Sequence, residues 1–144
     1  MVSVLAILAL SNTLNDSVNA AEREILLRRT FWAVAWVESR GDPRAFNPKE
    51  KAAGIVQIRP IMLADANRII GWQRWTPADR FDVEQSWQMF RLVCRYYAPQ
   101  GTPEQWARIW NGGPRGTKKA NTIAYWLKVK GALAQPRVLR PANP

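Results

Sequence analysis

Apolar residues recur at helical spacing along most of the chain. Residues 21–38 are predicted to form one helix, with two glutamates in its first turn and an almost wholly apolar stretch over 31–37. A helix that is apolar on nearly every side packs inside a protein. It is expected to end at 39–43, where a glycine and the restriction before a proline both stop helical propagation. Glu38 would therefore lie in the last turn of a core helix.

Capping residues and glycine stops mark the remaining helices. A proline suits the first position of a helix, and a Ser, Thr or Asp followed three residues later by Gln or Glu forms a capping box. Pro60 begins one predicted helix, while Asp82 with Gln85 and Thr102 with Gln105 precede two others. The predicted helices cover 60–70, 83–97, 103–111 and about 117–130, the last closing at Gly131.

The segment between the first two helices has a different character. Residues 43–59 are interrupted by Pro43, Pro48 and Gly54 and show no helical period. We expect a loop there, with a short strand over 55–58. The pattern predicts a mainly α fold of the α+β kind, with a helical lobe and a small lobe of loop and short strand.

The two ends of the chain differ from the middle. An apolar run at 2–10 is too short to span a bilayer, and Val18-Asn19-Ala20 resembles a signal-peptidase site. No Lys or Arg precedes that run, so 1–20 is either a signal peptide cleaved near Ala20 or an uncleaved helical extension. We assign 21–131 to one domain and 132–144 to a proline-rich basic tail.

Composition then removes several classes of chemistry. A chain of 144 residues is the size of one domain, and 47% hydrophobic residues with 8 Trp supply enough core material. With no His, catalytic triads and His-ligated metals are excluded, and one Cys forms neither an internal disulfide nor a thiolate cage. Cys94, on an apolar helix face, is expected to be a small buried hydrophobe.

A formal net charge of +10 calls for a negatively charged partner. Nucleic acid, anionic lipid and bacterial wall polymer all qualify. The basic residues are scattered, with only a modest cluster at Arg115, Lys118 and Lys119. This distribution favours general surface charge over a helix that reads nucleic acid.

Glu38 is the best candidate acid. A carboxyl at the end of an apolar helix loses hydration in its charged form, so its pKa rises and it suits general acid catalysis near neutral pH. The alternative is an ordinary helix-end glutamate that faces solvent or pairs with Arg40.

Four motifs occur in order around this acid. They are Glu38-Ser39, G-I-V-Q at 54–57, I-W-N-G-G at 109–113, and T-I-A-Y at 122–125 followed by Val129. The set resembles the E-S, G-L-M-Q, A-Y-N-x-G and T-x-x-Y-x-x-x-V motifs of the soluble lytic transglycosylase (SLT-domain) family within the lysozyme-like superfamily. Four matches in the right order over about ninety residues are far more specific than any one alone.

The resemblance implies a lysozyme-like fold with a glycan cleft and cleavage of the MurNAc-β-1,4-GlcNAc bond of peptidoglycan. Glu38 would first protonate the leaving oxygen and then, as a carboxylate, accept the proton of the muramyl C6 hydroxyl while a 1,6-anhydro ring forms. No cofactor or metal is implied. The expected partner is the peptidoglycan strand. The protein is expected to be a monomer that works in the periplasm or outside the cell, and a phage-encoded lysin is an open alternative.

The same resemblance implies substrate contacts. Gln57 would bind the sugar beside the cleaved bond, Val56 would line the cleft, and Asn47 takes the position of a loop residue that contacts substrate. Trp110 stands where the family usually has Tyr, so Tyr125 is the alternative source of a hydrogen bond to Glu38.

Other residues near the motifs have supporting roles. Asn111 would brace the pocket, while Ser39, Gly54 and Gly112 would shape it, Gly54 either by admitting the sugar close to the backbone or simply as a turn residue. Trp32, Trp36 and Trp87 are expected in the core, and Trp72, Trp75 and Trp110 are candidates for stacking on glycan.

Three other functions remain open from the sequence. A hydrolytic muramidase would use Glu38 with water, although none of the nearby acids, Asp42, Glu50 and Asp65, is singled out as a second carboxylate. A basic helical nucleic-acid binder and a catalytically inactive wall-binding module are the non-enzymatic alternatives.

Overall fold

The computed structural model describes residues 4–135, which fold into five α-helices and a two-stranded sheet. The helices are α1 (Val4–Ser39), α2 (Pro60–Ile70), α3 (Val83–Tyr97), α4 (Pro103–Gly112) and α5 (Asn121–Leu133). Short 3-10 helices η1 (Pro77–Phe81) and η2 (Gly116–Lys118) precede α3 and α5. The mainly α architecture with a small loop-rich lobe is confirmed.

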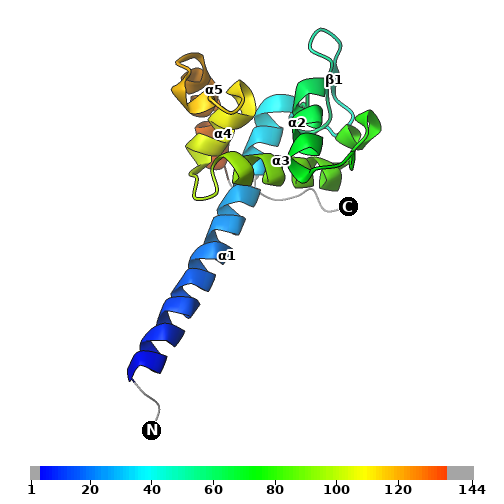
Figure 1. The fold of residues 1–144 in the computed structure, drawn as a ribbon. Coiled ribbons are helices and arrows are strands. Elements are labelled where there is room, and N and C mark those ends of the chain that lie inside the picture. The colour runs from blue at the N-terminus through cyan, green and yellow to red at the C-terminus, as the bar shows by residue number, and fades with distance from the viewer. Residues whose placement is uncertain (1–3, 136–144) are drawn as a thin grey trace.

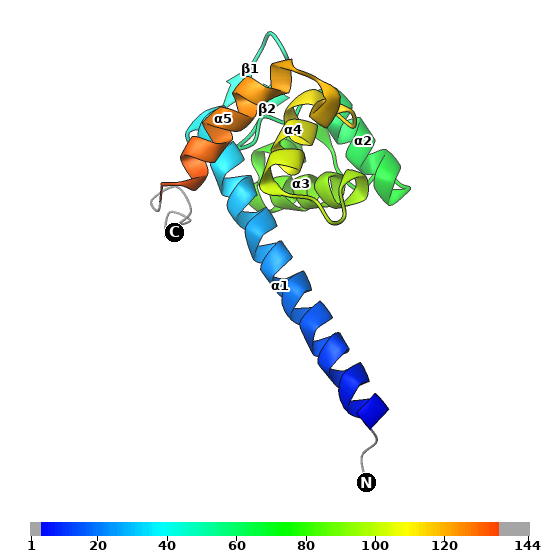
Figure 2. The ribbon, with the colours of Figure 1, turned by 90° about the vertical axis from the view of Figure 1, so that its left-hand side faces the viewer.

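Helix α1 is much longer than predicted. It begins at Val4 rather than at residue 21, because nothing between 4 and 20 is a glycine or proline that would stop it. Its N-terminal half projects away from the other helices (Figures 1 and 2). Glu24 therefore lies in mid-helix, where it forms ion pairs of 2.6 and 2.7 Å with Arg91 and Arg95 of α3. Cleavage near Ala20 stays a prediction, and the residues 136–144 of the predicted tail lie outside the described part.

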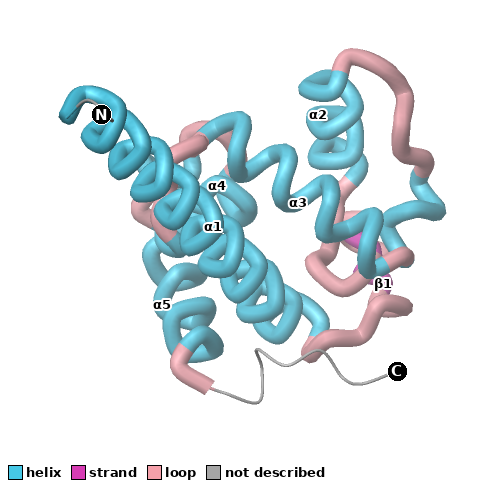
Figure 3. The backbone as a smooth tube through the Cα atoms, turned by 90° about the horizontal axis from the view of Figure 1, so that it is seen from below, coloured by secondary structure: helices cyan, strands magenta, loops and turns pink. Residues whose placement is uncertain are grey.

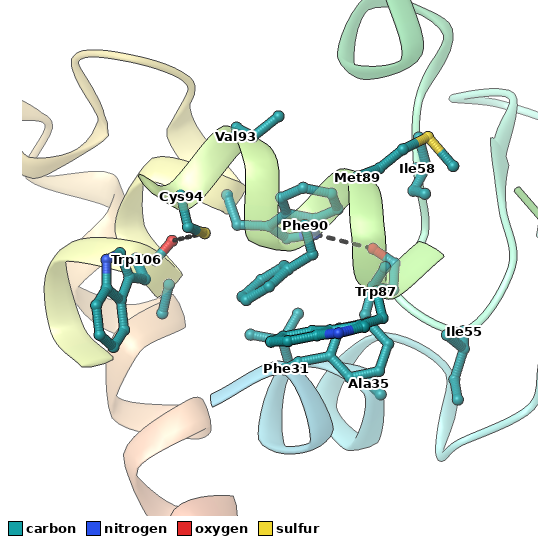
Figure 4. Packing of buried hydrophobic residues seen from close by; sticks show 14 of the residues in the cluster. Phe31, Ala35, Ile55, Ile58, Trp87, Met89, Phe90, Val93, Cys94 and Trp106 are labelled. Carbon is teal, nitrogen blue, oxygen red and sulfur yellow. Dashed lines mark hydrogen bonds between the residues drawn. The ribbon is translucent and has the colours of Figure 1, made fainter. Parts of the chain in front are cut away.

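The C-terminal half of α1 is the centre of the fold. It passes between α5 on one side and α3 on the other (Figure 3). Phe31 of α1 is fully buried and meets the rings of Trp87 and Phe90 edge to face, at centroid distances of 5.4 and 5.5 Å (Figure 4). The ring of Trp32 lies edge to face with Phe31 at 5.2 Å. Cys94 is fully buried in the same cluster, as predicted. This packing fixes the end of α1, and hence Glu38, against three other helices.

The capping signals placed three helices correctly, with one variation. Thr102 and Gln105 form the predicted capping box of α4, and Pro60 is the first residue of α2. At α3, Asp82 Oδ1 accepts the Gln85 N–H at 2.8 Å, but the Gln85 side chain accepts the Trp75 indole N–H instead of closing the box. The last helix begins four residues later than predicted, because residues 116–118 form η2.

The small sheet is not where the sequence predicted it. Strands β1 (Phe46–Asn47) and β2 (Ala52–Ala53) pair antiparallel, Phe46 opposite Ala53. The predicted strand over 55–58 is a tight turn in which Ala53 and Ile58 exchange backbone hydrogen bonds of 3.1 and 2.8 Å. Positive φ angles at Gly54 (81°) and Gln57 (51°) bend the chain there, and an extended strand cannot contain them.

Gly54 is required by a neighbouring backbone. A Cβ at this position would lie 1.7 Å from the Arg80 carbonyl oxygen. The space beside Gly54, where a sugar could have approached the backbone, is occupied by Arg80. The Arg80 guanidinium in turn donates to the carbonyls of Lys51 and Ile58, both at 2.8 Å, and so clamps the small lobe onto η1.

We predict that Gly54→Ala destabilises the protein far more than Gly41→Ala. The two glycines have nearly identical φ angles of 81° and 82°, but nothing lies within 4 Å of a Cβ at Gly41. Gly41→Ala should cost about 1–2 kcal/mol of unfolding free energy for the left-handed conformation alone, and Gly54→Ala about 4 kcal/mol or more. Chemical denaturation of both variants measures the difference; equal losses would contradict the contact with Arg80.

Candidate active site

Glu38 lies at the meeting point of the helical lobe and the small lobe. It is half-buried in the last turn of α1, as the sequence predicted. The Tyr125 hydroxyl of α5 donates a hydrogen bond of 2.7 Å to Glu38 Oε1 across 87 residues of sequence. The structure thus supplies from Tyr125 the contact that the Trp at position 110 does not make.

A pocket of about 190 Å³ opens beside Glu38. Four of the residues predicted from sequence to surround the acid line it together with Glu38: Asn47, Gln57, Trp110 and Asn111. Three more lining residues were not predicted to belong to the site: Glu50, Arg59 and Met62. The motifs that are far apart in the sequence therefore meet around one small, polar cavity.

The turn after β2 is held in place by hydrogen bonds from several elements. Ser39 Oγ donates to the Ile55 carbonyl at 2.7 Å, which ties the end of α1 to this turn. Gln57 Nε2 donates to the carbonyls of Ala45 and Gly54 at 3.2 and 3.0 Å. Gln57 thus lines the pocket and also fixes the loop that carries it.

Trp110 supports the pocket from behind. Its indole N–H donates to the Val56 carbonyl at 3.0 Å, and its side chain is only 2% exposed. Val56 is also fully buried and does not line the pocket, contrary to expectation; Met62 of α2 supplies the apolar wall. Because nearly all of its ring is covered by protein, Trp110 has no free face on which a sugar could stack.

The other two tryptophans proposed for glycan stacking do not lie in this pocket. Trp75 is 2% exposed, because its indole is held by Gln85 beneath the loop before α3. Trp72 is 59% exposed but does not line the pocket around Glu38. Periodicity alone could not separate these three rings, since all of them sit at or near helix ends.

Gly112 and Asn111 form the end of α4. A Cβ on Gly112 would lie 2.6 Å from Thr122 Cγ2, so glycine there lets the start of α5 approach α4. The Asn111 carbonyl accepts a hydrogen bond of 3.2 Å from Arg59 Nη2, which joins α4 to the N-terminus of α2. These contacts bring α5, which carries Tyr125, and Arg59 close to the Glu38 carboxyl group.

Asn47 organises the turn that brings Glu50 into the pocket. Its Oδ1 accepts the backbone N–H groups of Lys49 and Glu50 at 3.0 and 3.4 Å. Arg59 comes two residues after the end of the G-I-V-Q motif and directly before Pro60, the first residue of α2. That adjacency is the sequence signal that marks Arg59, whereas nothing in the local pattern marks Glu50.

The environment raises the pKa of Glu38 above its usual value. Burial is the largest cause, because it disfavours the carboxylate, and the negative charge of Glu50 acts in the same direction. The hydrogen bond from Tyr125 and the positive charges of Arg59 and Lys128 oppose this shift. Burial also raises the pKa of Tyr125 well above its usual value, so its hydroxyl remains a donor. The site can hold a proton on Glu38 and stabilise the anion that remains after the proton leaves.

Within residues 4–135, no group of three or more His, Cys, Asp or Glu side chains is arranged to hold a metal ion. In that same range no helix is both long and apolar enough to cross a membrane. The pocket has one acid with a raised pKa, Glu38, surrounded mainly by amide and charged side chains.

A sequence model of the transglycosylase SLT domain matches residues 17–130, most of the chain. The protein belongs to the SLT-domain family. This membership confirms the resemblance seen in the four motifs. A lysozyme of Magallana gigas is 50% identical to the SLT-domain protein over 38 residues, which cover 24% of this chain and 28% of that lysozyme.

We predict that Glu38→Gln stabilises the SLT-domain protein at neutral pH. A carboxyl whose pKa is raised on folding binds more protons in the folded state, so stability falls as pH rises from the unfolded pKa, about 4.3, through the raised value. Glutamine does not titrate and avoids that loss. Thermal unfolding should show a higher midpoint for the variant at pH 7 and a smaller difference at pH 4; a constant difference would contradict the raised pKa.

We also predict that Tyr125→Phe moves the pH profile of glycan cleavage. The variant loses the hydrogen bond that favours the Glu38 carboxylate, so the pKa of Glu38 rises further and the high-pH limb of kcat/KM moves to higher pH. Tyr96→Phe, which alters an exposed tyrosine on α3, is the matched control and should leave the limb in place. A limb that does not move in Tyr125→Phe would contradict the role of this contact.

Proposed function

We propose that this SLT-domain enzyme is a lytic transglycosylase that cleaves the MurNAc-β-1,4-GlcNAc bond and forms a 1,6-anhydro-MurNAc end. The observation that carries the proposal is the Tyr125–Glu38 hydrogen bond beside a pocket lined by Gln57 and Asn47. Tyr125 occupies Oε1 of Glu38, so the other carboxyl oxygen carries the transferable proton. Such an arrangement supports a single carboxyl group that works first as an acid and then as a base.

In the first step, Glu38 gives its proton to the glycosidic oxygen while the bond between that oxygen and the muramyl C1 breaks. The electron pair of the broken bond stays on the departing GlcNAc oxygen, and positive charge develops at C1. Burial alone would hold the proton too tightly for this transfer. The Tyr125 hydroxyl and the charge of Arg59 offset that effect, because both stabilise the carboxylate that Glu38 becomes.

In the second step, the Glu38 carboxylate takes the proton of the C6 hydroxyl, whose oxygen bonds to C1 and closes the anhydro ring. Glu38 is protonated again and no water is consumed. Gln57, Asn47 and Asn111 line the space where the sugar would lie, and their amide groups suit its hydroxyl and acetamido groups. We propose these three as sugar ligands and Trp110 as a buried support for them.

A hydrolytic muramidase is the second candidate, and one observation favours it. Glu50 lines the same pocket as Glu38, so a second carboxylate that the sequence did not single out is within the site. In that reaction Glu50 would accept a proton from water as the water oxygen bonds to C1. The segment shared with a lysozyme is consistent with this outcome as well as with the first.

The substrate also bears on where the enzyme works. A peptidoglycan-cleaving enzyme acts in the cell envelope, and we propose a periplasmic or secreted protein that degrades the wall as a monomer. The net charge of +10 would hold it against an anionic wall, with a strength that falls as salt rises. A phage-encoded lysin would meet the same substrate.

Product analysis of digested sacculi tests the proposal. We expect wild type to release 1,6-anhydro-muropeptides, Glu38→Gln to lose activity by a factor of about 10² to 10⁴ while remaining folded, and Glu50→Gln to give the same anhydro products. Mass spectrometry distinguishes the products, because hydrolysis adds one water. Reducing MurNAc ends that disappear in Glu50→Gln would instead establish the muramidase, and full activity in Glu38→Gln would overturn both reactions.

A further inference from the structure

Helix α5 is apolar on two opposite sides. Its inner side is buried against the rest of the protein at three positions, Thr122, Val129 and Ala132. The same side carries Tyr125, which meets Glu38. On the outer side, Ile123 and Leu127 lie one turn apart and are 47% and 59% exposed. A helix that packs on a core needs only one apolar side, so the fold accounts for the inner side of α5 and not for the outer one.

The outer side forms a continuous stripe with a lysine at each edge. At about 3.6 residues per turn, three small exposed residues fall on the same side as Ile123 and Leu127; they are Ala124, Gly131 and Ala134. Lys130 lies at one edge of this stripe and Lys128 at the other, and both are exposed. The outer side of α5 is therefore an apolar strip between two cations.

Positive charge is concentrated in this part of the chain. Residues 105–144 hold eight of the 21 Lys and Arg residues and none of the 11 Asp and Glu residues. Arg115, Lys118 and Lys119, the cluster seen in the sequence, lie in and beside η2, directly before α5, and all three are exposed. Among residues 4–135, ion pairs reach none of these three cations, nor Lys128 or Lys130. Unpaired cations thus occur at both ends of α5.

An anionic lipid surface fits this combination of charge and apolar exposure. A helix that lies in a bilayer interface places aliphatic side chains at the boundary of headgroups and acyl chains. Lysines at its edges extend their stems along the apolar surface and bring their ammonium groups to the lipid phosphates. Nucleic acid or a soluble wall polymer would use the cations but would leave Ile123 and Leu127 in water. The apolar stripe therefore favours lipid among the polyanions that the charge allows.

We propose that the outer side of α5 docks the enzyme on the surface of a bilayer that contains anionic phospholipids. Ile123 and Leu127 enter the headgroup region, while Lys118, Lys128 and Lys130 face the phosphates. The helix lies on the membrane and does not cross it. Because Tyr125 is on the inner side of α5, docking leaves its contact with Glu38 intact. The enzyme would then work on the glycan strands that lie next to the membrane.

Vesicle binding by the full chain tests the proposal. Flotation assays would compare vesicles of phosphatidylcholine alone with vesicles of an equimolar mixture of phosphatidylcholine and phosphatidylglycerol. We expect at least about tenfold tighter binding to the mixed vesicles, since several cations face the anionic surface. The difference should shrink as salt rises.

A pair of single substitutions tests the apolar stripe. Leu127→Gln leaves the net charge unchanged and should weaken binding to the mixed vesicles about fivefold or more, because a leucine no longer enters the interface. Ile25→Gln is the matched control, since Ile25 on α1 is 62% exposed and lies outside the stripe. The control should bind vesicles as wild type does.

A pair of double substitutions tests the cations. Lys118→Gln with Lys130→Gln should weaken binding about tenfold or more, because each cation near an anionic surface contributes a factor of about five. Lys128 is left unchanged, since its charge also acts on Glu38. Arg44→Gln with Lys49→Gln removes the same amount of charge from two exposed positions in the small lobe and is the matched control. It should retain nearly all of the binding.

The outcomes also separate lipid docking from the proposed function. All four variants should cleave isolated sacculi as wild type does, which shows that they are folded and that the reaction needs no membrane. Docking by α5 is overturned if Leu127→Gln binds the mixed vesicles like wild type, or if either control loses as much as its partner. Should the lysine pair matter while Leu127→Gln has no effect, and duplex DNA or teichoic acid show the same dependence, the surface binds soluble polyanions instead. Loss of cleavage by wild type would bear on the proposed function alone.

Discussion

The hydrogen bond from Tyr125 to Glu38 is the contact on which the site depends. It joins the last turn of α1 to α5, and its length of 2.7 Å requires both helices to be placed to within a fraction of an ångström. Burial drives the proton onto Glu38, and this bond, with the charge of Arg59, makes the anion accessible again. A carboxyl that was only buried would hold its proton, and one that was only paired with cations would lose it before meeting a substrate.

Other hydrogen bonds hold the elements around the Tyr125–Glu38 contact in place. Ser39 fixes the loop after β2 to α1, Trp110 fixes it to α4, and Arg59 fixes α4 to α2. Each of these bonds uses a backbone carbonyl as the acceptor, and the Gln57 side chain adds two more such bonds from within the loop. The apolar cluster around Phe31 supplies the packing that keeps α1 from shifting beneath them. Catalytic geometry and fold stability are thus maintained by the same contacts.

Short-range sequence signals predicted the helix ends, which are determined by short-range contacts. Capping residues and glycine stops placed α2, α3 and α4, because a helix end is fixed by a few neighbouring side chains. The strands were misplaced, because strands of two residues leave little pattern in the sequence and the segment around them is held by the distant Arg80, whose guanidinium donates to the Lys51 and Ile58 carbonyls. Whether the first helix extends before residue 21 was left open, because a signal-like segment and a helix have the same apolar character.

Site residues were likewise predicted where the local sequence marks them and missed where only the fold brings them together. The motif residues Glu38, Gln57 and Asn111 were found because their types and order are distinctive, and Tyr125 was found as the alternative to Trp110. Glu50 carries no such mark, and Arg59 is marked only by its place close behind the G-I-V-Q motif, since the fold brings both residues to the pocket beside Glu38. The stacking role expected of Trp75 and Trp110 was wrong because burial depends on tertiary packing that periodicity does not show.

The most direct test of this account is the ionisation state of Glu38 itself. Infrared difference spectra of wild type against Glu38→Gln, recorded across a pH titration, isolate the carbonyl stretch of the protonated carboxyl and the bands of the carboxylate. Because burial raises the pKa of Glu38, the protonated band should persist above the pH at which an exposed glutamate ionises. A carboxyl group that is already ionised at about pH 4.3, as in an unfolded chain, would contradict it.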